Sequence, residues 1–232
     1  MKIKKKTIIT VLVITIIFVL AILGGYFAHQ KYQEYLLARE TDKIGNLDIL
    51  KDQVDMEVYT TGDYAVVEKT MKNYISNYGK ISQQVITLID DETLKNLLTV
   101  ERIEQDGKEF YDTLTYLEKK KTDIENTMNQ MITMTSDQEI MNAIKKEKVS
   151  VSYQNLYRKM MLDSDIATAL KQEQNNLIDT KEKTIAFIDD YIKIFEFLKE
   201  NGSSYMVSDG QILFQNESLY QQYQSLVNSL QN

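Results

Sequence analysis

"YAVVEKTMKNYISNYGKISQQVITL", residues 64–88, repeats its apolar side chains at alternating intervals of three and four residues. Such a repeat places successive positions on one stripe of an α-helix, the pattern of coiled coils and helical bundles. The stretch therefore predicts an all-α fold, in which this helix packs against others. The pattern fits an intramolecular bundle and an intermolecular coiled coil equally well. Its eight heptad positions are Tyr64, Val67, Met71, Tyr74, Tyr78, Ile81, Val85 and Leu88.

A second apolar run extends from Val100 to Met131 in the same register and predicts further long helix. Two of its positions, Gly107 and Lys121, are not apolar. Glycine permits a kink or the close approach of a neighbour, so a continuous helix and a break at Gly107 both remain open. Lys121 can lay its aliphatic stem along the stripe and keep its ammonium group in water.

Three more helical segments are expected before residue 202. Ser136 and Glu139 have the spacing of a capping box, which predicts that a short helix starts there. A second short segment follows around Val149, and a last long helix runs to Asn201, where Gly202 ends it. The second half of that long helix has a wide apolar stripe, which favours a central place within one chain. Residues 63–201 are therefore predicted to form an elongated antiparallel helical bundle.

Residues 202–232 are predicted to form a small β-hairpin and a C-terminal amphipathic helix packed on the bundle, and Asn216 can cap the start of this helix. Two short β-prone runs flank Asp209-Gly210, a strong hairpin signal. An isolated two-stranded hairpin is marginal in water, so it should pack against the bundle end. It could be a recognition finger, although a rigid connector is the favoured interpretation. The candidate interaction residues are Tyr205, Val207, Asp209, Gly210, Ile212 and Phe214.

The N-terminal region contains a run from Thr7 to Ala28 without a charged residue. As a helix it would be about 33 Å long, enough to span a hydrocarbon core of about 30 Å. The run is longer than the apolar part of a secretory signal, about 7–15 residues, and cleavage after Ala28 would place bulky Tyr26 where a small residue is preferred. We therefore expect a retained signal anchor at residues 7–28.

Four basic residues before this run are expected to determine its topology. Positive charge is retained on the cytoplasmic side, which predicts a cytoplasmic tail at 1–6 and an extracytoplasmic body. Residues 29–62 would then form a juxtamembrane stalk or linker. The expected localisation is the cell membrane, as a single-pass protein in contact with lipid through residues 7–28. The topology-determining residues are Lys2, Lys4, Lys5 and Lys6.

Composition narrows the class of function. The net charge is −7, and four of the lysines precede the apolar run, so the remainder is more acidic still. Nucleic acid is therefore a poor partner, since phosphate contacts need Lys and Arg. The absence of Cys excludes disulfides and Cys–His chemistry, and the absence of Pro suits long helices. Abundant Ile, Lys, Asn and Tyr are typical of an AT-rich bacterial genome.

Signals of catalysis are weak. His29 is the only histidine and follows the apolar run directly, so a Ser–His–Asp triad would have to be built beside the membrane. No glycine-rich phosphate motif is present. The acidic groups around Asp91, Asp165 and Asp189 are expected to cap helices or lie on solvated faces, because none has the spacing of a calcium loop. We therefore predict no catalytic, cofactor or metal site, and a protein that is not an enzyme.

The sequence favours an interaction or adaptor module in the bacterial cell envelope. Its expected partner is another envelope protein or a second copy of the chain. The alternative is a ligand-binding or sensing bundle that signals through a membrane partner.

Overall fold

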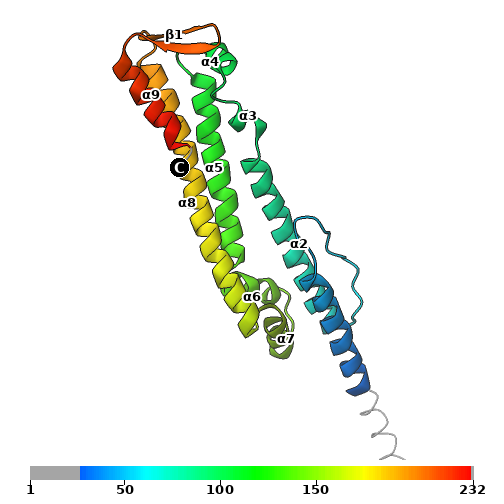
Figure 1. The fold of residues 1–232 in the computed structure, drawn as a ribbon. Coiled ribbons are helices and arrows are strands. Elements are labelled where there is room, and N and C mark those ends of the chain that lie inside the picture. The colour runs from blue at the N-terminus through cyan, green and yellow to red at the C-terminus, as the bar shows by residue number, and fades with distance from the viewer. Residues whose placement is uncertain (1–26, 231–232) are drawn as a thin grey trace, which may run out of the picture. The chain divides into compact units, whose positions relative to one another are not determined.

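The computed structural model describes residues 27–230, which are mainly helical with one small antiparallel hairpin before the last helix (Figure 1). These residues form two units. Unit 1 contains residues 27–76 and 141–163, and unit 2 contains residues 77–140 and 164–230. Most of the predicted anchor, residues 7–28, lies outside the described residues. Between residues 27 and 230, no helix is both long and apolar enough to cross a membrane.

Unit 1 is built around the first half of α2 (Asp63–Ile89). Residues 27–45 are helical, residues 46–62 form neither helix nor strand, and α7 (Val151–Met161) completes the unit. Tyr64 of α2 meets Tyr153 of α7 edge to face, with ring centroids 5.0 Å apart. The buried apolar residues of this unit are Leu36, Leu37, Tyr64, Val67, Met71, Ile144, Val149, Tyr157 and Met161.

Unit 2 is a helical bundle. Its longest helices are α5 (Tyr111–Met134) and α8 (Ser164–Glu200), which run antiparallel: Lys121 of α5 pairs with Asp189 at 2.6 Å, and Lys181 of α8 donates to Asn129 at 3.0 Å. The second half of α2 also lines the core. The buried apolar residues include Ile81, Val85, Ile103, Phe110, Leu117, Ile124, Met128, Ile188, Ile194, Phe195 and Leu198.

Shorter elements complete unit 2. They are α3 (Glu92–Lys95), α4 (Val100–Asp106), the start of α6 (Asp137–Lys145), strands β1 (Tyr205–Ser208) and β2 (Gln211–Phe214), and α9 (Glu217–Ser229). α8 contacts both α5 and α9, as the wide apolar stripe predicts.

The heptad prediction for α2 is confirmed, since all eight of its positions are buried or half-buried. The two halves of the stripe serve different cores, because α2 contributes its first half to unit 1 and its second half to unit 2. Polar side chains beside the stripe, among them Glu68, Lys72 and Ser82, are also buried. A hydrophobic repeat does not predict these polar residues.

The helix is interrupted at Gly107, so the second of the two alternatives left open by the sequence is the one found. α4 ends at Asp106, Gly107 has a φ of 72°, and α5 begins at Tyr111. Phe110 stands before α5 with a left-handed φ of 48° and a fully buried side chain. The carboxylate of Asp106 accepts a hydrogen bond from the Thr113 amide at 3.0 Å, which satisfies one exposed donor of the new helix. Burial of Phe110 therefore accompanies an unusual backbone at this break.

The predicted caps are also found. Ser136 accepts a hydrogen bond from the Glu139 amide at 3.3 Å before α6, and Asn216 accepts one from the Leu219 amide at 3.0 Å before α9. The ammonium group of Lys121 was expected to lie in water. It instead pairs with Asp189 across the α5–α8 interface.

Candidate interaction surface

The hairpin is present with the expected turn. β1 and β2 are antiparallel, with Tyr205 opposite Phe214 and Val207 opposite Ile212. Asp209 and Gly210 have φ values of 52° and 72°, the positive values that a two-residue type I′ turn requires. Asp and Gly tolerate this left-handed conformation, which explains why the turn could be predicted from two residues.

The two faces of the hairpin differ in exposure. Tyr205 is buried, while Val207, Ile212 and Phe214 are half-buried. The opposite face carries the cross-strand pair Met206 and Leu213, which are 61% and 45% exposed. Of the six predicted interaction residues, the four apolar ones therefore belong to the inner face, and Asp209 and Gly210 form the turn.

Aromatic contacts hold the inner face on unit 2. The ring of Phe214 lies 5.3 Å from that of Tyr223 in α9 and 6.2 Å from that of Phe197 in α8. Lys108 donates to the carbonyl oxygen of Gly202, and its ammonium group lies 5.6 Å from the Tyr205 ring. Because the inner face is anchored in this way, the hairpin presents its outer face at the end of the bundle.

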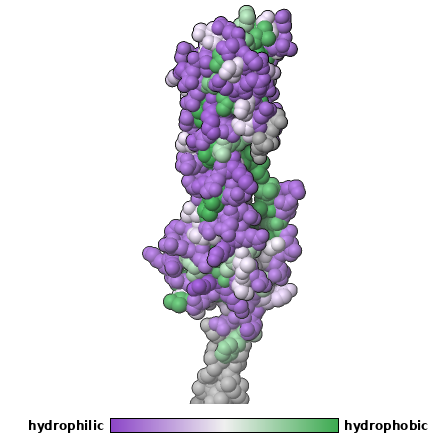
Figure 2. Space-filling model, turned by 60° about the vertical axis from the view of Figure 1, so that its left-hand side comes forward, coloured by the Kyte–Doolittle hydropathy of each residue, from purple (hydrophilic) through white to green (hydrophobic). Residues whose placement is uncertain are grey.

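Met206 and Leu213 thus form the exposed part of the hairpin, and we call them the outer hairpin pair. Side chains alternate between the two faces of a strand, so Met206 and Leu213 lie on the other face from Tyr205 and Phe214. This period of two was the signal in the sequence that could have identified them. Figure 2 shows hydrophobic colour at the top of that view, where the hairpin lies, next to hydrophilic surface. An exposed apolar pair on a rigid hairpin can contact a partner without a change of backbone.

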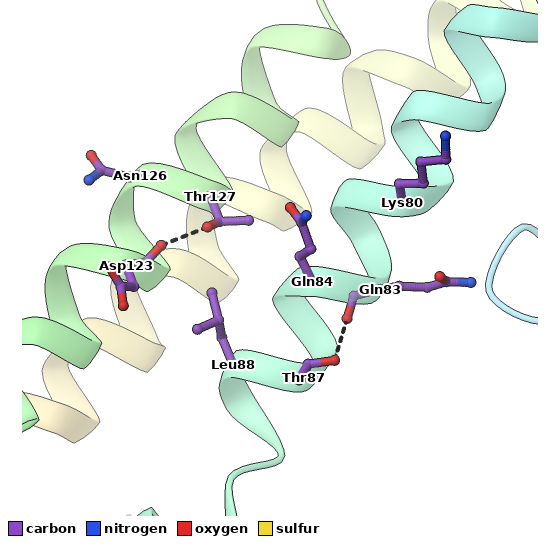
Figure 3. Close-up of a pocket in the computed structure, with 8 residues that line it drawn as sticks. All are labelled: Lys80, Gln83, Gln84, Thr87, Leu88, Asp123, Asn126 and Thr127. Carbon is purple, nitrogen blue, oxygen red and sulfur yellow. Dashed lines mark hydrogen bonds between the residues drawn. The ribbon is translucent and has the colours of Figure 1, made fainter.

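An open groove of about 690 Å³ lies between α2 and α5 within unit 2. In Figure 3, Gln84 and Leu88 of α2 lie toward α5, which contributes Thr127. The Thr127 hydroxyl donates to the Asp123 carbonyl of its own helix at 2.7 Å. Seven of the eight lining residues have polar side chains, but carbon atoms make up most of the surface that they expose to the groove: Lys80, Gln83, Gln84, Thr87, Leu88, Asp123, Asn126 and Thr127.

A polar cluster joins the end of α2 to α5. Asp91 caps α3 by accepting a hydrogen bond from the Thr93 amide at 2.8 Å. The same side chain accepts hydrogen bonds from Lys120 and, at 2.8 Å, from the Tyr116 hydroxyl. Burial opposes ionisation of Asp91, but these hydrogen bonds outweigh it and lower its pKa to about 2. Burial and the hydrogen bond to Asp91 raise the pKa of Tyr116.

Asp91 is expected to make stability depend on pH. Its pKa is lower in the folded chain than the ordinary value of 3.8, so its contribution is present at neutral pH and is lost as the pH falls toward 2. The Asp91→Asn variant should lose about 2 kcal/mol of unfolding free energy at pH 7, and the difference from wild type should disappear near pH 2. Urea unfolding at both pH values measures this.

Asp90→Asn is the matched control for this experiment. Asp90 is the neighbouring residue and pairs with Lys95 on the surface, where an ion pair contributes only about 0–1 kcal/mol. If Asp90→Asn and Asp91→Asn lost equal stability at pH 7, the polar cluster would not have the assigned effect.

Unit 1 contains a group of buried charges that the sequence interpretation missed. Lys72 of α2 pairs with Glu68 at 2.8 Å and with Glu40 of the 27–45 helix at 3.0 Å. All three side chains are at most 1% exposed. Glu40 is also paired with Lys43 at 2.7 Å and with Arg39 at 3.2 Å, so its charge is balanced from two sides. We call Glu40, Glu68 and Lys72 the buried charge triad.

The buried charge triad holds the end of the segment 46–62. Lys72 donates to the Glu57 carbonyl oxygen at 2.6 Å. Glu68 accepts hydrogen bonds from the Thr60 amide at 2.9 Å, from the Thr60 hydroxyl at 2.7 Å and from the Tyr59 amide at 3.1 Å. These bonds supply the backbone partners that a segment without secondary structure lacks. The triad therefore fixes residues 57–60 of this segment to α2.

The charges of the triad support one another. Burial alone would lower the pKa of Lys72, but its hydrogen bonds to Glu68 and Glu40 raise it. Burial alone would raise the pKa values of both glutamates, but their hydrogen bonds to lysine lower them. All three groups are thus ionised at neutral pH. Glu68 and Lys72 have the i, i+4 spacing of a helical ion pair, which was the only local signal.

Some residues singled out from the sequence lie outside the described residues, namely Lys2, Lys4, Lys5 and Lys6. His29 is exposed. Within residues 27–230, no group of three or more His, Asp or Glu side chains is placed to hold a metal ion. Asp189 pairs with Lys121, and Asp190 with Lys193 at 2.7 Å.

Comparisons of the chain with models of known protein families, with curated proteins and with solved structures found no match.

Proposed function

We propose that this chain is a single-pass, membrane-anchored protein whose extracytoplasmic helical body binds another protein of the bacterial envelope and catalyses no reaction. The observation that carries the proposal is the charge-free run Thr7–Ala28, preceded by four lysines. Its length suits the hydrocarbon core, and its flanking charge favours a cytoplasmic N-terminus. The finer architecture, one transmembrane helix followed by an elongated antiparallel bundle, is part of this proposal.

The outer hairpin pair is the part of the body that we assign to the partner. Met206 is unbranched and adaptable, a property that favours Met at binding surfaces. The inner face of the hairpin is held by aromatic contacts, so binding would not require ordering of a loop, which otherwise opposes association. The expected partner surface is an apolar depression that accepts two neighbouring aliphatic side chains.

Crosslinking of intact cells tests this proposal. A membrane-impermeant amine reagent should modify a C-terminally tagged chain, because exposed lysines such as Lys69 and Lys80 would lie outside the cell. Purification should recover a defined envelope protein as the crosslinked species. The variant Met206→Ser with Leu213→Ser should yield less of that adduct. Modification only after cell lysis would overturn the orientation.

A matched control uses another exposed apolar pair of unit 2. Ile86 and Ile89 of α2 are 46% and 39% exposed. Their joint replacement by serine should leave the adduct unchanged. If both double variants lost it equally, the hairpin would not be the binding site. If the only crosslinked species were adducts between two copies of this chain, the partner would be a second copy and not another envelope protein.

The open groove between α2 and α5 favours a second candidate function, the binding of a small ligand by a sensing bundle. Amide and hydroxyl groups on two helices can fix the orientation of such a ligand. A ligand that binds the folded chain raises its melting temperature by mass action, which distinguishes this function from protein docking.

A further inference from the structure

The 27–45 helix has two different sides. One side is buried and consists of Gln33, Leu36, Leu37 and Glu40. Phe27, Tyr32 and Tyr35 are 62%, 58% and 63% exposed. At 3.6 residues per turn, these three aromatic residues fall within an arc of about 140°, centred roughly opposite the buried side. Aromatic side chains are thus gathered on the exposed side of the helix.

We propose that Phe27, Tyr32 and Tyr35, which we call the aromatic rim, lie at the lipid–water interface of the membrane that residues 7–28 span. This inference rests on the proposed anchoring of the chain. The aromatic side of the first turns of the 27–45 helix would contact the headgroup layer, while the buried side of this helix packs in unit 1.

The depth of these residues agrees with such a position. The apolar run ends at Ala28. With a rise of 1.5 Å per residue, Tyr32 and Tyr35 lie about 6 Å and about 10 Å further along the helix. The polar headgroup layer adds about 5–8 Å on each side of the hydrocarbon core. Helical side chains point back toward the N-terminus, so both tyrosine rings reach toward the bilayer.

The chemistry of the rim also fits. Tyrosine has an apolar ring and a polar hydroxyl, and it is enriched where one end of the side chain meets lipid and the other meets water. The neighbouring Lys31 is paired with Glu34 at 2.8 Å, so this part of the helix carries little net charge. Contact with lipid would therefore depend on aromatic burial, and a zwitterionic membrane should suffice. Attraction to anionic lipid needs a cluster of basic residues instead.

The chain contains no tryptophan, so one introduced indole reports on one position. The variants Tyr32→Trp and Tyr35→Trp test the rim. Tyr111→Trp is the matched control, because Tyr111 is an exposed tyrosine of unit 2. Each full-length variant is reconstituted into phosphatidylcholine vesicles. Tryptophan fluorescence is then recorded with ordinary lipid, with lipid brominated near the headgroup, and with aqueous acrylamide.

Tyr32→Trp and Tyr35→Trp should emit at shorter wavelength than the control and lose emission in brominated lipid. Tyr111→Trp should lose emission only with acrylamide. The proposed position of the rim is overturned if the two test variants behave as the control does. It is also overturned if neither brominated lipid nor acrylamide reduces their emission, because the indoles would then be covered by a protein partner. Flotation of the vesicles separates the two proposals, because a chain that does not float with lipid refutes the anchor itself.

Discussion

Replacing Lys72 by methionine is expected to destabilise unit 1 by about 3–5 kcal/mol, the usual cost of removing one partner of a buried ion pair. Methionine has a similar length and leaves little cavity, so the loss would come from electrostatics. Glu40 and Glu68 would remain buried without their shared cation, and the Glu57 carbonyl would lose its donor. Urea unfolding followed by far-ultraviolet circular dichroism measures the change.

Two further variants make this result specific. Lys69→Met removes an exposed lysine from the same helix and should change stability by no more than about 0.5 kcal/mol. A triple variant, Lys72→Met with Glu40→Gln and Glu68→Gln, removes every charge of the triad and should recover part of the loss. If Lys72→Met were no less stable than Lys69→Met, the triad would not stabilise unit 1.

Truncation of Phe195 to alanine is expected to cost about 3–5 kcal/mol, as is typical for a buried aromatic residue. Phe195 of α8 is fully buried and its ring lies 5.3 Å from that of Phe110. Phe110 stands at the break before α5 with a left-handed backbone. The cavity would therefore weaken the α5–α8 core at the point where the chain changes direction. Thermal or urea unfolding measures the loss.

Tyr111→Ala is the control for this prediction. Tyr111 is the aromatic residue that follows Phe110, but it is 75% exposed. Its truncation creates no cavity and should cost no more than about 0.5 kcal/mol. Equal losses from Phe195→Ala and Tyr111→Ala would contradict the assignment of Phe195 to the core of unit 2.

Much of the fold could be predicted because its signals are local. The heptad positions of α2, the caps at Ser136 and Asn216, and the Asp209-Gly210 turn each depend on residues within a few positions of one another. Gly107 could not be decided in this way. The apolar run has the same period on both sides of the glycine, so a continuous helix and a broken one have the same local pattern.

The candidate surface was predicted only in part. The hairpin and its turn were expected, but the outer hairpin pair was not chosen, because apolar residues of β1 and β2 lie on both faces. Which face is buried depends on Phe197 of α8 and Tyr223 of α9, because the rings of both residues lie against Phe214. The pattern of the strands alone does not show where these two helices pack.

By itself, the sequence determined the helical class, the position of the hairpin, the main caps and the charge-free N-terminal run. Periodicity, capping and turn geometry act over a few residues, so they can be inferred without a tertiary structure. Only the tertiary structure decided that α2 serves two units, that Glu40 meets Lys72, and that Asp91 meets Lys120. Charged residues are usually exposed, and they become buried only when packing brings a partner from a distant segment to neutralise them.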